Sequence, residues 1–272
     1  MDTRDPVPAP PPGIVPLLRR LAAEAVGTGL LATAVVGPGI AAARLSPTDV
    51  GLQLAENAAA TGAALAVIIL LVGPVSGAHL NPLVSLADWW LGRPHHPGSR
   101  AGLTLPEVGA YTLAQTAGGI AGAVLANLMF DLPAVTWSTT RRTGGNLWLS
   151  EAVATAGLVA VVFALARSGR AALSAATVGA YIAAAYWFTS STSFANPAVT
   201  VARAFTDTFA GIAPASIAGF ALAQAVGTAI AAVGTRLLYP DPSASAAVVV
   251  APHTDRPAAP ARLTAGSRDR RP

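Results

Sequence analysis

The sequence predicts an all-α membrane protein, a bundle of six transmembrane helices plus two re-entrant half-helices arranged as an inverted repeat. Three observations support this prediction: the composition, six long apolar stretches and two copies of a short Asn-Pro motif. Of the 272 residues, 53% are hydrophobic and only 11% are charged, whereas soluble domains carry about 25% charged residues. The chain has no cysteine, so disulfide bonds and thiol chemistry are excluded.

Six apolar stretches are each long enough to cross about 30 Å of hydrocarbon as a helix. In chain order we expect these spans at Leu17–Val36, Leu54–Val72, Leu105–Leu128, Leu147–Ala166, Ala171–Phe188 and Ala215–Leu238. They are rich in small residues, which let helix backbones approach closely in lipid.

Two shorter segments, Asn81–Leu91 and Asn196–Phe205, are predicted to be half-helices. They begin with related motifs, Asn81-Pro82-Leu83 and Asn196-Pro197-Ala198. Asn is a strong cap residue, and Pro is favourable at the first helical position because its missing N–H would have no partner there. If the two helix starts meet inside the membrane, their positive dipole ends favour neutral solutes and repel cations and protons.

The two halves of the chain repeat each other. Glu24-Ala-Val-Gly-Thr28 in the first span corresponds to Glu151-Ala-Val-Ala-Thr155 in the fourth. Three spans per repeat is an odd number, so the second copy must be inverted relative to the first. The sequence therefore predicts inverted repeats at about residues 17–128 and 147–239, with a shared site near the membrane midplane.

We interpret residues 17–239 as one channel domain between two polar, Pro-rich segments, residues 1–16 and 240–272, which we expect to be disordered cytoplasmic arms. With both termini in the cytoplasm, thirteen of the 17 basic residues lie inside and four outside, as the positive-inside rule requires. This bias explains the basic charge without nucleic-acid binding. All 17 basic residues are arginine, which indicates a GC-rich bacterial genome and hence a bacterial inner membrane.

At these motifs the sequence resembles the aquaporin, or major intrinsic protein, superfamily. The matching residues are Ala23-Glu24…Thr28, Ser76-Gly77-Ala78-His79-Leu80-Asn81-Pro82 and Phe194-Ala195-Asn196-Pro197-Ala198. The resemblance covers about Leu17 to Leu238. It implies an aquaporin-like bundle with a pore in each protomer of a homotetramer, in which the amides of Asn81 and Asn196 donate hydrogen bonds to the solute. Leu83 departs from the alanine usual at the third motif position, and so predicts added bulk at or behind the pore centre.

The resemblance also implies an outer selectivity filter at four positions: Thr61, Ala184, Ser193 and Val199. Val199 stands where most members of the family have arginine. We therefore expect a wide filter without a cation or an aromatic side chain. Such a filter should pass polyols such as glycerol and metalloid acids such as arsenite as well as water. In this respect the sequence resembles a bacterial subgroup of aquaporins linked to arsenic resistance.

Four further polar residues have two interpretations each. Arg203 lies one helical turn past Val199 and either supplies the missing filter charge from the vestibule or, as we favour, pairs with Asp207. Glu24 and Glu151 either relay protons or, as we favour, accept N–H bonds from the loops before the half-helices. His79 either ligates a metal or, as we favour, is a loop residue whose carbonyl lines the pore.

The leading function is a passive channel for small uncharged solutes, without cofactor, metal or catalysis. A general water and glycerol channel is the alternative within this class. An ion-coupled secondary transporter also uses inverted repeats, but the expected pore offers no acidic residue beyond the two structural glutamates. An intramembrane enzyme is disfavoured because the chain has no cysteine and no HExxH or GxSxG motif.

Overall fold

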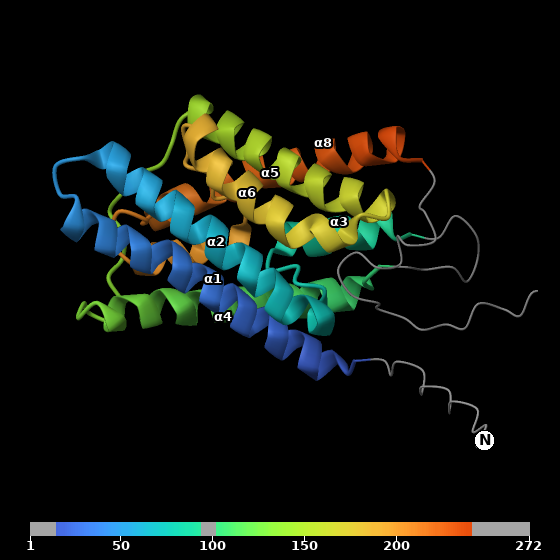
Figure 1. Ribbon diagram of the computed structural model, residues 1–272, viewed down its shortest axis with the longest axis horizontal. Helices are drawn as coiled ribbons and strands as arrows, with labels where there is room; N and C mark the ends of the chain where they lie inside the picture. Colours follow the sequence, from blue (N-terminus) through green and yellow to red (C-terminus); the bar gives the residue numbers. More distant parts are fainter. Residues whose placement is uncertain (1–14, 94–101, 241–272) are drawn as a thin grey trace, which may run out of the picture.

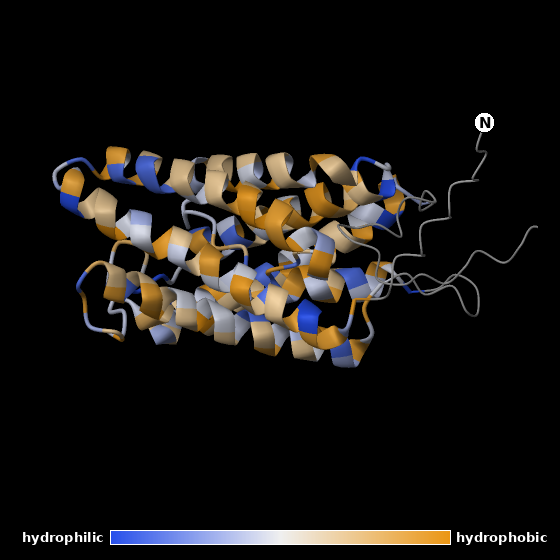
Figure 2. Ribbon diagram, turned by 60° about the horizontal axis from the view of Figure 1, so that its bottom comes forward, coloured by the Kyte–Doolittle hydropathy of each residue, from blue (hydrophilic) through white to orange (hydrophobic). Residues whose placement is uncertain are grey.

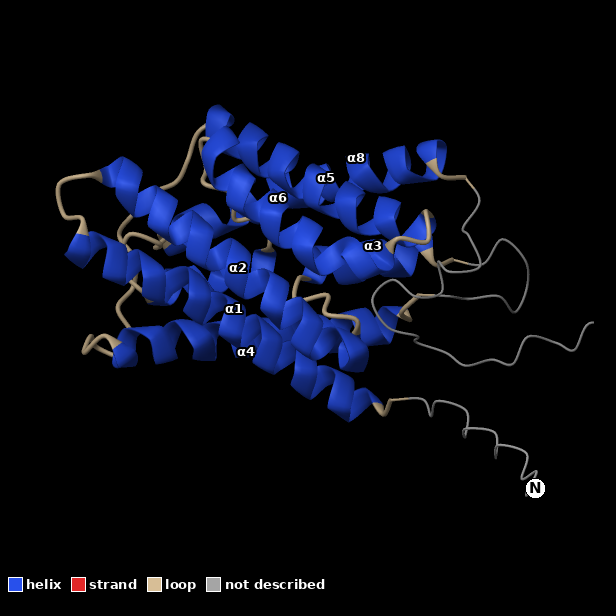
Figure 3. Ribbon diagram, in the orientation of Figure 1, coloured by secondary structure: helices blue, strands red, loops and turns tan. Residues whose placement is uncertain are grey.

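The structure is a computed structural model that describes residues 15–93 and 102–240. All regular secondary structure within these ranges is helical (Figure 3). Apart from residues 15, 16 and 240, the predicted arms at 1–16 and 240–272 lie outside the described residues.

Six helices in the described part of the chain are long and apolar enough to cross a membrane. They are α1 (Leu17–Leu45), α2 (Val50–Ser76), α4 (Leu105–Met129), α5 (Gly145–Arg167), α6 (Ser174–Phe188, extended at its start by the 3-10 turn η1, Ala171–Leu173) and α8 (Ile217–Leu238, preceded by the turn η3, Pro214–Ser216). Two short helices complete the bundle: α3 (Pro82–Leu91) and α7 (Pro197–Ala202, continued by the turn η2, Arg203–Phe205). This arrangement confirms the predicted fold class.

The main difference from the predicted spans is in α1, which continues past Val36 and through Pro38 to Leu45. A proline ends most helices in water, but transmembrane helices tolerate it because neighbouring groups satisfy the freed carbonyl. The prediction of the end at Val36 was therefore too short.

The long helices run side by side along the bundle, and the start of α1 lies at the same end as the end of α8 (Figure 1). Helix α1 packs against α2 and α4, α5 packs against α8 and α6, and α6 packs against α2. The two repeats use the same close contact. A Cβ on Gly118 of α4 would lie 2.0 Å from the Ala25 carbonyl of α1, and a Cβ on Gly227 of α8 would lie 2.2 Å from the Ala152 carbonyl of α5.

The outer surface of the bundle suits a bilayer. Apolar residues run along the outer helices, and strongly hydrophilic residues are grouped mainly toward the two ends of the bundle (Figure 2). Large exposed apolar side chains include Leu70, Leu71, Leu113, Leu222 and Ile230. In water such a surface would be unstable, whereas lipid tails solvate it.

The half-helices enter the bundle from opposite ends. Helix α3 packs against α4 and α8, α7 packs against α1, α4 and α8, and the two half-helices also contact each other. Their positions place the Asn-Pro motifs inside the bundle, where the site is formed.

Candidate functional site

The two Asn-Pro motifs meet tip to tip. Asn81 and Asn196 are the N-caps of α3 and α7, with side-chain oxygens that accept the Leu83 N–H at 2.9 Å and the Ala198 N–H at 3.0 Å. Each side-chain amide then donates across the junction, Asn81 Nδ2 to the Ala195 carbonyl at 2.8 Å and Asn196 Nδ2 to the Leu80 carbonyl at 2.6 Å. This reciprocal pair fixes the two helix starts against each other.

The loops that precede the tips share one unusual backbone conformation. In the first loop Gly77, Ala78 and Leu80 have positive φ, and in the second loop Thr192, Ser193 and Ala195 do, at the same offsets from the motif Asn. Non-glycine residues adopt this left-handed conformation at a cost, so surrounding contacts must hold it in place.

Glu24 and Glu151 supply those contacts. The Glu24 carboxylate accepts the backbone N–H groups of His79 and Leu80 at 2.9 and 2.6 Å, together with Ser76 Oγ and Gln115 Nε2. The Glu151 carboxylate accepts the N–H groups of Phe194 and Ala195, both at 2.9 Å, and Gln224 Nε2 at 2.6 Å. Both carboxylates are fully buried. These contacts favour the structural interpretation of the two glutamates over a proton relay.

A cavity runs past the two asparagines. It contains about 800 Å³ of empty space, including the parts that open to solvent, and its wall extends from Ser174 at the start of α6 to Tyr186 near its end. Twelve residues separate these two positions, which corresponds to about 18 Å along the helix. One part of the wall is apolar, formed by Leu31, Val35, Leu65, Ile69, Val84, Leu158, Val162, Val178, Ile182 and Val199. The polar part includes Thr61, His79, Asn81, Asn196 and Ser193.

Three of the four predicted filter residues, Thr61, Ser193 and Val199, line this cavity. The fourth prediction, Ala184, needs correction because its side chain is exposed on the outside of α6 and is not part of the wall. The wall at this level is formed by Tyr186, which is buried and donates a hydrogen bond from its hydroxyl to Thr61 Oγ1 at 3.3 Å. The error arose because α6 carries no motif that fixes the rotation of its faces. An aromatic side chain therefore lies beside the predicted filter, where we expected none.

Arg203 also departs from the favoured prediction. It is only 2% exposed, lines the cavity, and places its guanidinium 3.4 Å from the centre of the Phe194 ring. Asp207, the expected partner, instead accepts hydrogen bonds from the Thr139 N–H and hydroxyl. The turn η2 breaks the helical geometry after Ala202, so the i+4 pairing expected on a continuous helix does not form. The end of the cavity near Arg203, Tyr186 and Thr61, here called the η2 end, thus carries a cation.

A second guanidinium lies near the same ring. Arg142, in the segment between α4 and α5, is 5.1 Å from the Phe194 ring centre and donates from Nε to the Gly211 carbonyl at 2.9 Å. Burial lowers the pKa of Arg142 below its ordinary value. Sequence reasoning missed Arg142 and Tyr186, because no local pattern brings their segments to the second loop. Phe194 stands in the second motif, but its ring was given no role there.

The remaining predicted residues support the tips from behind or line the cavity. Leu83 and Ala198 are buried but do not line the cavity, so the extra bulk of Leu83 lies in the packing behind it. Pro82 and Pro197 occupy the first helical positions, as predicted. His79 lines the cavity with its Nδ1 3.0 Å from Ser85 Oγ, and the described residues contain no group of three metal-ligating side chains.

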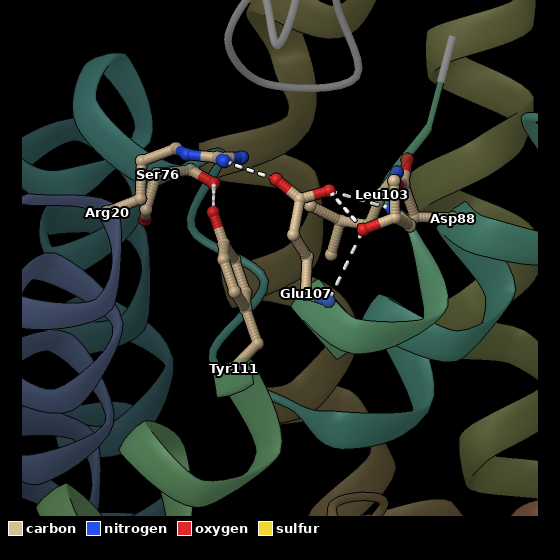
Figure 4. Close-up of polar contacts among 7 residues, drawn as sticks. Arg20, Ser76, Asp88, Leu103, Glu107 and Tyr111 are labelled. Carbon is tan, nitrogen blue, oxygen red and sulfur yellow. Dashed lines mark hydrogen bonds and ion pairs between the residues drawn. The ribbon is translucent and has the colours of Figure 1, made fainter. Parts of the chain in front are cut away.

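A polar cluster near the start of α1 holds the first pore loop (Figure 4). Arg20 forms an ion pair with Glu107, which also completes a capping box with Thr104 at the start of α4. Tyr111 donates to the Ser76 carbonyl at 2.9 Å, and its ring lies 5.4 Å from that of His79. The cluster therefore joins α1, α4 and the end of α2 beside the cavity wall. The Thr104-x-x-Glu107 spacing is the one sequence signal that could have located it.

Comparisons with known proteins agree with this geometry. The model of the family described as "Major intrinsic protein" matches residues 14–194, a range that ends just before the second Asn-Pro motif. The chain is 52% identical over 215 residues to aquaglyceroporin AqpS of Rhizobium meliloti, which covers 79% of this chain and 88% of that protein. It is 33% identical over 181 residues to aquaporin NIP6-1 of Arabidopsis thaliana, covering 63% of this chain and 53% of that protein.

Among solved structures, the chain is similar to the X-ray structure of the aquaglyceroporin from Plasmodium falciparum. The TM-score is 0.64 at 20% sequence identity, and the match covers 83% of this chain and 98% of that chain. At this identity the likeness shows the fold alone.

Proposed function

This chain belongs to the major intrinsic protein family, a family of membrane channels rather than enzymes, and we propose that its pore conducts metalloid acids such as arsenite in addition to water and glycerol. The resemblance drawn from the sequence motifs is thereby confirmed. The observation that carries the proposal is the cavity wall, which sets the amides of Asn81 and Asn196 against a long apolar face.

Such a wall suits small polyhydroxy solutes. Each motif Asn uses one amide hydrogen across the junction, and an amide group has two. The second hydrogen of each is available to a solute oxygen. Glycerol presents hydroxyls on one side and carbon on the other, so its carbon chain can contact Leu31, Leu65 and Val178. Arsenous acid carries three hydroxyls on one centre and offers a similar size and hydrogen-bonding capacity.

We propose that the constriction at the η2 end is formed by Thr61, Tyr186, Ser193, Val199 and Arg203. Val199 leaves the usual arginine position without a charge, and Arg203 brings its guanidinium to the same cavity from one turn further along. This proposal replaces the expectation of a filter free of arginine. Because the cation is displaced rather than absent, protons and cations are still repelled.

The glutamate contacts support a passive channel over an ion-coupled transporter. In the described part of the chain no Asp or Glu lines the cavity, and the two buried glutamates are each engaged by two backbone N–H groups. A carboxylate held in this way is not available to bind and release a coupling ion.

For topology and assembly we propose a multi-pass protein of the bacterial inner membrane, with both termini in the cytoplasm, embedded in the lipid bilayer as a homotetramer. The arginine bias supports this orientation, and the start of α1 and the end of α8 lie at one end of the bundle. The exposed apolar side chains suit both lipid and a neighbouring protomer.

Stopped-flow light scattering on proteoliposomes tests the proposal, with water, glycerol, urea and arsenite compared against protein-free vesicles. We expect protein-dependent flux of water, glycerol and arsenite that does not change with sodium or proton gradients. Flux that requires a gradient would favour a transporter. Water and glycerol flux without arsenite flux would reduce the function to a general water and glycerol channel.

A further inference from the structure

The η2 end of the cavity holds a buried cation that has no anionic partner among residues 15–93 and 102–240. Arg203 is 2% exposed, and its Nε donates to the Ala210 carbonyl. In the described part of the chain its two terminal nitrogens make no hydrogen bond and no ion pair. Because Arg203 lines the cavity, a ligand in the cavity can reach these donors.

Ser193, which precedes Phe194 in the chain, provides a second unsatisfied group in the same cavity. The residue is 3% exposed and lines the cavity, and its hydroxyl oxygen is buried without a hydrogen-bond partner among the described residues. A buried hydroxyl without a partner is costly, which indicates that the pore contents satisfy it. Ser193 has a positive φ of 51°, so the loop holds this side chain in place at some cost.

The charges around the two residues do not neutralise the cation. The buried carboxylate of Glu151 forms no ion pair with Arg203 and accepts three hydrogen bonds from Phe194, Ala195 and Gln224. Arg142 adds a second positive group beside Phe194. An uncompensated buried charge is expensive, so an anion at this position would be stabilised.

We propose that Arg203 and Ser193 form a binding subsite for a small monovalent carboxylate at the η2 end of the pore. A carboxylate matches the planar fork of a guanidinium with two parallel hydrogen bonds, and the Ser193 hydroxyl donates a third. Thr61 and Val199, which share the constriction proposed above, line the same cavity, so a small carboxylate is the appropriate ligand. This inference rests on the proposed function, since the subsite lies in the conducting pore.

Competition with glycerol flux tests the subsite, with sodium formate as the probe and sodium chloride at equal concentration as the salt control. At neutral pH formate is an anion. We expect formate to inhibit glycerol flux through the wild-type protein in proteoliposomes. In Arg203→Gln the inhibitory concentration should rise by about tenfold or more, because charge-assisted hydrogen bonds are lost. Arg203→Lys keeps the charge without the fork and should lie between the two.

Two further variants keep the test decisive. Ser193→Ala removes only the third hydrogen bond and should weaken inhibition less than Arg203→Gln does. Arg141→Gln removes an exposed arginine next to Arg142 and should leave inhibition unchanged. Equal inhibition in the wild type and Arg203→Gln, or none in a wild type that conducts glycerol, would overturn the subsite. Absence of glycerol flux in the wild type would instead overturn the proposed function.

Discussion

Replacement of Glu151 tests whether the buried glutamates hold the pore loops or move protons. The Glu151 carboxylate accepts three hydrogen bonds, from the N–H groups of Phe194 and Ala195 and from Gln224 Nε2, at 2.6–2.9 Å. In Glu151→Ala all three donors lose their acceptor in a site that water does not reach, because Glu151 is fully buried.

The size of the effect follows from these contacts. Each unsatisfied buried donor costs about 1–3 kcal/mol, so Glu151→Ala should lose about 3–9 kcal/mol of stability, a large part of the 5–15 kcal/mol typical of folded proteins. Glu151→Gln keeps one acceptor oxygen for the Phe194 N–H. The new side-chain N–H group can donate a hydrogen bond to Gln224 Oε1, which is buried without a partner in the wild type, if the Gln224 amide turns over. Two donors are then unsatisfied, the Ala195 N–H and the turned Gln224 Nε2, which also leaves Thr200 Oγ1, and the loss is about 2–6 kcal/mol.

The order of stability expected is wild type, then Glu151→Gln, then Glu151→Ala. Thermal unfolding of the detergent-solubilised protein, monitored by size-exclusion chromatography, measures it. Glu151→Gln should melt about 4 °C or more below the wild type, since each 1 kcal/mol corresponds to ~2–4 °C in a chain of this size. Glu151→Ala should be recovered poorly. In proteoliposomes Glu151→Gln should pass glycerol at the wild-type rate per folded channel. The structural interpretation is refuted if Glu151→Ala is as stable as the wild type, or if Glu151→Gln folds normally but no longer conducts.

Three further predictions follow from the packing and the cavity. Val199→Arg should lower glycerol flux by about tenfold or more while water flux falls less, because it adds volume and a second cation beside Arg203. The control Val199→Thr keeps the size of the valine side chain and should conduct glycerol normally. Equal glycerol flux in both variants would contradict the constriction we propose. Gly122→Ala should destabilise the bundle by more than about 1 kcal/mol because its Cβ would lie 2.0 Å from the Gly29 carbonyl. By contrast, a Cβ added at Gly109 would have nothing within 4 Å, so Gly109→Ala should stabilise α4 by up to about 1 kcal/mol. The same melting temperature for the Gly122 and Gly109 variants would show that the close contact of α1 and α4 is not needed. Asn196→Ala removes the hydrogen bond to the Leu80 carbonyl and the cap of α7. We therefore expect the free energy of unfolding to fall by about 2–3 kcal/mol and glycerol flux to slow. A melting temperature equal to that of the wild type would show that the contact between the tips of α3 and α7 does not stabilise the fold.

The corrections at the filter show where sequence reasoning reaches its limit. Thr61, Ser193 and Val199 were located by counting from the two motif asparagines, and all three line the cavity. Ser193 and Val199 lie three residues from Asn196, so few intervening torsions can shift them, and Thr61 lies on α2, which leads directly into the first loop. Ala184 lies on α6, which carries no motif that fixes which of its faces turns to the cavity, and an error of two residues turns a helix by more than half a turn. The same count therefore passed over Tyr186, which is in the wall.

The sequence by itself determined the six spans, the two capped half-helices and their inverted pairing, because hydropathy, capping residues and a repeated motif are local signals. Only the tertiary structure decided what faces the solute at the η2 end. The left-handed residues of the two loops, the turn η2 that separates Arg203 from Asp207, and the rotation of α6 that brings Tyr186 to Thr61 all depend on contacts between segments far apart in the chain. Those contacts place a guanidinium at the cavity wall, one turn past the valine at the predicted filter position.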